Sequence, residues 1–203
     1  KDMGRRVDNI VIMGIGEPFD NYDQVVKFLR MISDESGLNI SQRGITVSTC
    51  GLVDKMYRFA DEHMGVTLAV SLHAPDDEIR KSIMPVANRY SIEEIIKACH
   101  YYVKETGRRV TFEYSMIAGV NDTKACADEL SGLLKGLLCH VNLIPLNDVL
   151  ERVHKRSTDE GIFYFQKYLE KNRINVTVRK GMGADIDAAC GQLRKKYIDA
   201  CKP

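Results

Sequence analysis

A glycine-bearing loop that follows a short apolar run contains the first residues that could act on a ligand. The run Ile10–Met13 is followed by Gly14, Gly16 and Glu17. Glycine lets the backbone turn sharply and approach a ligand without a Cβ in the way. Glu17 could present its carboxylate, or the loop its carbonyl groups, to a ligand amine. The alternative is a solvated loop acid, which the composition by itself favours.

Four further polar residues lie at or just after the ends of apolar runs. They are Ser48, Ser71, His73 and Asn147. His73 could act as an acid, a base or a hydrogen-bond donor, although a single histidine in such a place is more often structural. The two serines could bind a ligand carboxylate or cap the next helix. Asn147, which follows Pro145 closely, is typical of a turn.

Among six widely spaced cysteines, Cys190 has the least determined role. The others are Cys50, Cys99, Cys126, Cys139 and Cys201. Their spacing fits neither a disulfide framework nor a zinc knuckle, and the five histidines form no i, i+4 metal pair. A reactive thiolate needs positive charge nearby, whereas Asp185 and Asp187 precede Cys190. From the residues alone, Cys190 is interpreted as a buried thiol.

The composition is that of a globular protein. Of 203 residues, 44% are hydrophobic and 28% are charged, which suffices for a single core and argues against disorder. No run is apolar for long enough to cross a bilayer, and residues 1–8 lack the apolar segment of a secretory signal. The net charge is +1, so RNA binding would need local basic clusters. We expect a cytoplasmic protein without a membrane contact.

An alternation of strands and helices would position these residues. Period-2 and buried apolar patterns predict strands at 10–13, 45–48, 66–72, 109–116, 140–144 and 175–179. Helical spacing predicts helices at 21–32, 52–60, 76–81, 91–103, 123–134 and 157–169. Capping boxes are predicted at Asn21, Ser91 and Ser157, and Phe28 and Phe163 are expected to face the core.

The fold class predicted from this alternation is α/β, with parallel strands in an open or partial (β/α) barrel. No linker or composition break divides the chain, so residues 1–203 are expected to form one domain. Chemistry in such folds gathers at the carboxyl ends of the strands. Those ends carry Gly16, Glu17, Ser48, Ser71, His73, Glu113, Ser115, Asn147 and Arg179. We therefore expect a site at that rim.

Five segments, taken in order, resemble one family. They are 13–18 with Asn21, 48–51, 71–74, 142–147, and 178–180 with 185–193. Together they resemble the radical S-adenosylmethionine (radical SAM) RNA methyltransferases of the RlmN and Cfr type, which methylate an adenine of 23S ribosomal RNA in the large subunit. The match covers essentially the whole chain, and the sequence Ala-Ala-Cys-Gly-Gln-Leu at 188–193 is its most specific part. The resemblance implies a partial (β/α) barrel of the radical SAM type.

The resemblance also implies S-adenosylmethionine and a [4Fe-4S] cluster as cofactors. Gly16 and Glu17 would hold the methionine amine, and the rest of S-adenosylmethionine would contact Ser48, Ser71, Leu72, His73 and Asn147. Cys190 would carry the methyl group. One S-adenosylmethionine would methylate its sulfur, and a second, cleaved by the reduced cluster, would give the radical that activates the S-methyl group for addition to adenine. The partners of this monomer would be ribosomal RNA and an electron donor for the cluster.

The sequence departs from the family at the cluster. The Cys-x-x-x-Cys-x-x-Cys loop that holds it in the family does not occur here. We therefore expect a radical SAM core domain truncated at its N-terminus, inactive alone although the parent protein is an enzyme. Carbon 2 of the adenine is preferred as the commoner target. Carbon 8, as in Cfr-like resistance enzymes, and transfer RNA as a further substrate stay open.

Two other classes of function stay open as well. A barrel lyase or aldolase could use Glu113, His73 or a lysine on small metabolites, and would be active without iron. A non-catalytic RNA-binding relative would bind RNA in a salt-dependent way that survives Cys190→Ala.

Overall fold

A single sheet of six parallel strands forms the centre of the protein. The computed structural model describes residues 7–14, 16–146 and 155–179. The strands are β1 (Ile10–Ile12), β2 (Ile45–Thr49), β3 (Thr67–Ser71), β4 (Val110–Met116), β5 (Cys139–Pro145) and β6 (Asn175–Val178). Each strand pairs in parallel with the next one along the chain. The predicted alternation of strands and helices is confirmed, and within the described residues the sheet is open rather than a closed barrel.

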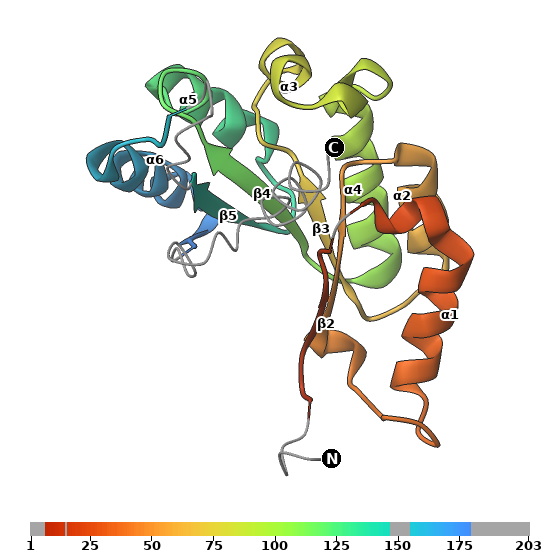
Figure 1. The fold of residues 1–203 in the computed structure, drawn as a ribbon. Helices are drawn as coiled ribbons and strands as arrows, with labels where there is room; N and C mark the ends of the chain where they lie inside the picture. The colour runs from red at the N-terminus through yellow and green to blue at the C-terminus, as the bar shows by residue number, and fades with distance from the viewer. Residues whose placement is uncertain (1–6, 15, 147–154, 180–203) are drawn as a thin grey trace, which may run out of the picture.

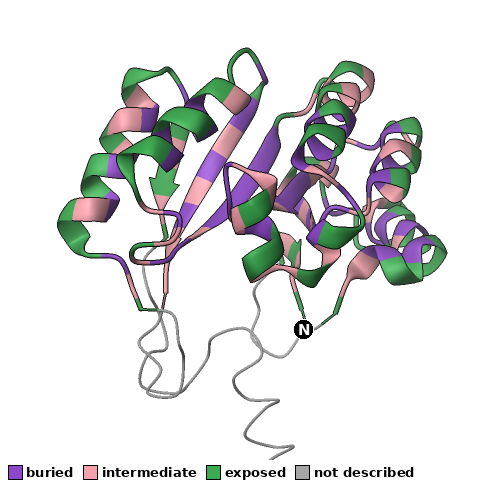
Figure 2. Ribbon diagram, turned by 90° about the horizontal axis from the view of Figure 1, so that it is seen from above, coloured by how far each residue is buried: buried purple, intermediate pink, exposed green. Residues whose placement is uncertain are grey.

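The helices cover one face of this sheet. They are α1 (Tyr22–Ser33), α2 (Val53–Asp61), α3 (Asp77–Ile83), α4 (Ile92–Thr106), α5 (Lys124–Leu133) and α6 (Asp159–Lys171). Short 3-10 helices span Pro18–Asn21 (η1), Gln42–Gly44 (η2) and Pro85–Asn88 (η3). Figures 1 and 2 show these helices arranged around the outside of the curved sheet. None of the helices in these ranges is long and apolar enough to span a membrane.

One of the three predicted helix caps is confirmed. Ser91 and Glu94 form a reciprocal capping box at the start of α4. Asn21 is the N-cap residue of α1, as predicted, but the predicted capping box is wrong, because the Asn21 side chain makes no capping bond. The chain instead enters α1 through η1, whose N-cap is Glu17.

The predicted cap at Ser157 is wrong by one residue. Thr158 is the N-cap of α6, and its hydroxyl oxygen accepts a hydrogen bond from the N–H of Gly161 at 3.1 Å. Thr158 has the extended backbone that an N-cap needs, with φ −66° and ψ 155°. Serine and threonine are adjacent here and both are good caps, so the residue types alone did not separate them.

The outer face of the sheet forms the core. Side chains from alternate strand positions, such as Val47, Val70 and Phe112, are fully buried against the helices. The predicted core positions of Phe28 and Phe163 are wrong, because these side chains are 37% and 60% exposed. Each lies one position away from the apolar stripe of its helix that contacts the sheet.

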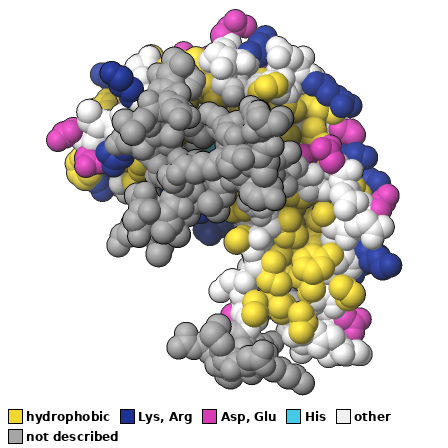
Figure 3. Space-filling model, viewed as in Figure 1, with side chains coloured by type: hydrophobic (Ala, Val, Ile, Leu, Met, Phe, Trp, Pro, Cys, Tyr) yellow, Lys and Arg dark blue, Asp and Glu magenta, His cyan; other side chains and the backbone are white. Residues whose placement is uncertain are grey.

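The inner face is polar over β2 to β6. Residues in register across it include Thr46 with Thr67, Thr111 with His140, and Asn142 with Thr177. At β1 the inner face becomes apolar, since Val11 lies in register with Thr46 and is 64% exposed. Figure 3 shows hydrophobic side chains gathered over this lower end of the sheet. The polar part of the inner face is where a ligand with many hydrogen-bonding groups would find partners.

Candidate functional site at the carboxyl rim

The loop after β1 is tied to the loop after β2 by Glu17. Its Oε1 accepts a hydrogen bond from the N–H of Phe19 at 3.0 Å, and its Oε2 accepts one from the N–H of Cys50 at 2.7 Å. Gly16 has φ +104°, which L side chains rarely adopt, and open space where a Cβ would lie. The carboxylate is therefore held in a fixed place beside an exposed stretch of backbone, and each of its oxygens keeps a lone pair.

Arg80, on α3, joins the carboxyl ends of β2 and β3. Its side chain is fully buried. Nη2 donates to the carbonyl oxygens of Cys50 at 2.8 Å and Ser71 at 3.2 Å, and Nε donates to that of Leu72 at 3.2 Å. A fourth bond, from Nη1, reaches the carbonyl of Tyr90 at 3.5 Å. The carbonyl groups at the carboxyl ends of two strands thus surround a buried cation.

Gly51 makes this arrangement sterically feasible. Its φ is +99°, and a Cβ at this position would lie 2.9 Å from Cδ1 of Ile95 and 3.4 Å from Nη2 of Arg80. Its N–H donates to the hydroxyl oxygen of the buried Thr49 at 3.1 Å. Only glycine combines this backbone conformation with such a close approach.

His73 lies at the exit of β3 with φ +59°. Its Nδ1 accepts a hydrogen bond from the N–H of Ser115 at 3.0 Å. Burial, with a further contribution from the Arg80 cation, lowers the pKa of His73 to about 4. The ring is therefore neutral at pH 7, and because Nδ1 accepts, its proton lies on Nε2, which can donate to a ligand.

Asn121 fixes the backbone around His73. It is fully buried, and its Nδ2 donates to the carbonyl oxygens of His73 at 2.7 Å and Ser115 at 2.6 Å. Its Oδ1 accepts from the N–H of Ile117 at 2.8 Å. The exits of β3 and β4 are thereby locked together.

Ser48 and Ser71 lie on neighbouring strands of the inner face. Ser48 is in register with Ala69, two residues before Ser71. Neither serine caps a helix, because the N-cap of α2 is Leu52 and that of α3 is Asp76. Both are partly exposed, so their hydroxyl groups are available on the open side of the sheet.

Glu113 and Asn142 continue this polar inner face onto β4 and β5. Asn142 Nδ2 donates to Glu113 Oε1 at 3.0 Å, and the two residues are in register. Burial raises the pKa of Glu113, while the bond from Asn142 and the charge of Arg179 act in the opposite direction. Glu113 was one of the rim residues that the strand ends predicted.

The described cysteines lack the environment of a reactive thiolate. Burial and the nearby Glu17 carboxylate raise the pKa of Cys50 to about 12, and Cys99, Cys126 and Cys139 are buried thiols. Cys190 and Asn147, both predicted site residues, lie outside the described residues. Residues 7–14, 16–146 and 155–179 contain no group of three or more His, Cys, Asp or Glu side chains that could hold a metal ion.

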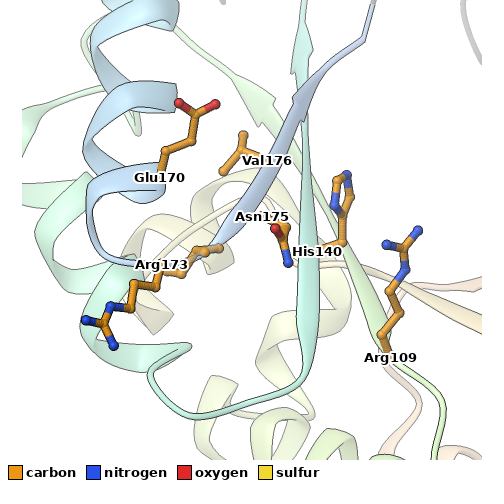
Figure 4. A pocket seen from close by; sticks show the side chains of 7 residues that line it. Arg109, His140, Glu170, Arg173, Asn175 and Val176 are labelled. Carbon is orange, nitrogen blue, oxygen red and sulfur yellow. The ribbon is translucent and has the colours of Figure 1, made fainter.

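A polar hollow at the opposite end of the strands is not part of this site. It is lined by residues at the amino ends of β4 to β6, including Arg109, His140, Arg173 and Asn175. Figure 4 shows the guanidinium of Arg173 pointing away from that of Arg109, so the two cations do not converge. Open α/β sheets bind ligands at the carboxyl ends of their strands instead.

The structure brings together most of the predicted rim and adds residues that the sequence did not indicate. Gly16, Glu17, Ser48, Ser71, Leu72 and His73 all lie along the carboxyl ends of β1 to β3. Arg80 and Asn142 were missed. Arg80 precedes Lys81 in a charged helix and had no signal of burial, whereas Asn142 had one, since it alternates with apolar residues in β5.

Comparisons with known proteins agree on one family. The sequence profile described as Radical SAM superfamily matches residues 1–127. A protein of Lachnoclostridium phytofermentans named probable dual-specificity RNA methyltransferase RlmN is 65% identical over 97% of this chain and 55% of its own length. A protein of the same name from Lachnospira eligens is 57% identical over 98% of this chain and 57% of its own length. The chain thus spans little more than half the length of these relatives.

Solved structures share the fold. The crystal structure of a radical SAM methyltransferase from Sphaerobacter thermophilus matches with a TM-score of 0.89 and 53% identity, over 94% of this chain and 56% of that one. A domain of a pyruvate-formate lyase-activating enzyme from Bacteroides vulgatus matches with a TM-score of 0.61 and 18% identity, over 86% of this chain and 100% of that domain. The second likeness concerns the fold alone.

Proposed function

Because the chain belongs to the radical SAM superfamily, we propose that its carboxyl rim binds S-adenosylmethionine and that the whole protein methylates an adenine in RNA. The observation that carries the proposal is that hydrogen bonds tie Glu17 to Cys50, Cys50 to Arg80, and His73 to Ser115, all along the carboxyl ends of the strands. This edge lies at the carboxyl ends of parallel strands, where such folds bind ligands.

The rim offers groups that match the two ends of S-adenosylmethionine. The Glu17 carboxylate, anchored by two backbone N–H groups, would accept hydrogen bonds from the methionine ammonium group beside Gly16. The N–H of His73 Nε2 would donate to an acceptor of the ligand. Ser48 and Ser71 would add hydroxyl groups from the inner face. Leu72, which is fully buried in the core, would support the loop next to them from the other side. Asn147 is proposed as a further contact.

The residues present do not fit the cluster. The six cysteines of the sequence include no Cys-x-x-x-Cys-x-x-Cys spacing. We therefore assign no step of the reaction to cluster ligands in this chain, and propose that the 203-residue chain has no methyltransferase activity by itself. In the whole protein a [4Fe-4S] cluster, reduced by an electron donor, would supply one-electron chemistry with S-adenosylmethionine.

Cys190 is the proposed methyl carrier. Its thiolate would take the methyl group from the sulfonium, forming a C–S bond while S-adenosylhomocysteine leaves and the thiol proton goes to solvent or a base. The proposed acceptor is carbon 2 of an adenine in 23S ribosomal RNA, with transfer RNA as a second substrate. The names of the curated relatives, which call them dual-specificity RNA methyltransferases, support the RNA substrate.

The test uses the whole protein with its cluster reconstituted without oxygen, S-adenosylmethionine and a reductant. We expect mass spectrometry of the digested protein to find a methyl group on Cys190, and nucleoside analysis of the RNA to find 2-methyladenosine. Cys190→Ala should abolish RNA methylation, whereas Cys139→Ser, at the amino end of β5 and away from the rim, is the thiol control and should keep it. An RNA product of Cys190→Ala at the unaltered rate would refute the carrier role, and 8-methyladenosine would refute the choice of carbon 2.

A further inference from the structure

Glu113 is a buried acid that the contacts proposed above do not use. It is 6% exposed. One carboxyl oxygen, Oε1, accepts the hydrogen bond from Asn142. The other, Oε2, is buried and has no hydrogen-bond partner in the part of the chain that the structure describes. A buried polar atom without a partner is costly and rare in folded proteins, so this oxygen calls for an explanation.

The carboxyl group lies beside the proposed cofactor contacts. Glu113 is in register with Ser71 on β3. Its own carbonyl oxygen accepts hydrogen bonds from the N–H groups of Leu72 at 3.1 Å and His73 at 3.2 Å. Its strand neighbours Phe112 and Tyr114 belong to the core on the other face of the sheet. Alternation along β4 therefore directs the Glu113 side chain to the polar inner face.

The surroundings of Oε2 leave it free to accept a hydrogen bond from a ligand. Asn142 holds Oε1, which fixes the orientation of the carboxyl plane. The Arg179 charge acts on Glu113, but no salt bridge between them is present among the described residues. An apolar ligand group would leave Oε2 unpaired, whereas a hydroxyl or amino group would pair with it.

We propose that Glu113, oriented by Asn142, is a further ligand-binding residue whose Oε2 accepts a hydrogen bond from a hydroxyl or amino group of an adenosine moiety. The inference deepens the proposed function and rests on it. Both proposed reactants, S-adenosylmethionine and the target nucleotide of the RNA, contain adenosine, with ribose hydroxyls and an exocyclic amine. The shared chemistry identifies the class of ligand, and the experiment distinguishes the two sources.

The experiment compares Glu113→Met and Glu113→Gln with the unaltered whole protein, loaded with its cluster. Methionine has a similar length but cannot accept a comparable bond, and glutamine has a single oxygen to share between Asn142 and the ligand. Thr111→Val is the matched control, since Thr111 is buried on the same face two residues closer to the start of β4. Calorimetric titrations measure the dissociation constants for S-adenosylmethionine and for protein-free ribosomal RNA, and thermal unfolding measures stability.

We expect Glu113→Met to weaken binding of one of the two ligands by about tenfold or more, as losing a hydrogen bond to a charged group does. The ligand-free protein should change little in thermal stability, because the removal of a desolvated carboxyl group offsets the hydrogen bond lost from Asn142. Loss confined to S-adenosylmethionine identifies the cofactor as the source, and loss confined to RNA identifies the target nucleotide. Thr111→Val should leave both constants unchanged.

Two outcomes would count against this reasoning in different ways. If the unaltered protein binds S-adenosylmethionine but neither Glu113 variant weakens either ligand, the subsite is refuted and the proposed function stands. If the unaltered protein, with its cluster filled, binds no S-adenosylmethionine, the proposed function fails. Should Glu113→Met not fold, Glu113→Gln decides by the same criteria.

Discussion

Replacing Arg80 by methionine would test whether the rim depends on its buried guanidinium. Four hydrogen bonds would be lost, to the carbonyl oxygens of Cys50, Ser71, Leu72 and Tyr90, at 2.8 to 3.5 Å. Burial lowers the pKa of Arg80, which reflects the cost of holding this cation away from water. Methionine fills most of the volume and carries no polar group, so the substitution isolates the bonds from the packing.

The loss of unfolding free energy in Arg80→Met can be estimated from the number of hydrogen bonds lost and from the removal of the buried cation. At a net value of about 1 kcal/mol each, four bonds give about 4 kcal/mol. Leaving buried carbonyl oxygens unpaired increases the loss, and removing a desolvated charge reduces it. We therefore expect Arg80→Met to lower the free energy of unfolding by roughly 3–5 kcal/mol. The free energy of unfolding of Arg80→Lys should lie between those of the unaltered protein and Arg80→Met, because lysine keeps the charge but donates from a single nitrogen.

The assay is urea unfolding of the chain followed by circular dichroism, with Tyr102→Phe as the control. The Tyr102 hydroxyl donates to the carbonyl of Val66 at 2.6 Å, at the amino end of β3 and away from the rim. Losing this single buried bond should cost about 1 kcal/mol. If Arg80→Met costs no more than Tyr102→Phe, the guanidinium does not hold the strand ends together and the reasoning is refuted.

Two further predictions concern the His73 loop. With a pKa of about 4 in the folded protein against about 6.5 when unfolded, the neutral ring stabilises the fold fully above pH 6.5 and this stability is lost as the pH falls towards 4. The unaltered protein should therefore lose up to about 3 kcal/mol of unfolding free energy relative to the His73→Asn variant as the pH falls over that range. A difference between the two proteins that does not change with pH would contradict the prediction. Asn121→Asp should destabilise the protein by roughly 3–4 kcal/mol at pH 7, because a carboxylate oxygen would face two carbonyl oxygens. Protonation of Asp at low pH should remove this repulsion, so the urea midpoint of Asn121→Asp should rise towards that of the unaltered protein as the pH is lowered. A midpoint that does not rise would argue against carboxylate repulsion as the cause.

The fold was predictable because its signals are local and repeated. Apolar runs with polar ends, followed by helical spacing, gave all six strands and their order along the chain. The rim followed from the same pattern, since the carboxyl ends of parallel strands must lie at one edge. Glu113 could be predicted as a rim residue because Thr111, Glu113 and Ser115 alternate with the apolar residues of β4.

The connections within the rim were not predictable because they join residues distant in sequence. The hydrogen bonds of Glu17 to Cys50 and of Arg80 to Cys50 cross 33 and 30 residues. An arginine in a short charged helix is usually solvated, whereas this one is fully buried against the carbonyl groups at the ends of β2 and β3. The capping bond predicted at Asn21 is absent for a related reason, because Pro18 starts a 3-10 turn that changes how the chain enters α1.

The backbone of one residue, Cys50, explains why these separate loops act together. The N–H of Cys50 donates to Glu17, and its carbonyl oxygen accepts from Arg80, which also binds the carbonyls of Ser71 and Leu72. A ligand held by Glu17 is therefore positioned relative to β3 through bonds that no single loop contains. An unpaired buried carboxyl oxygen, such as Oε2 of Glu113, reduces stability, so a fold selected for stability alone would not keep it. Such an oxygen beside a hydrogen-bonded framework at the carboxyl ends of the strands is what a site organised in advance for a polar ligand requires.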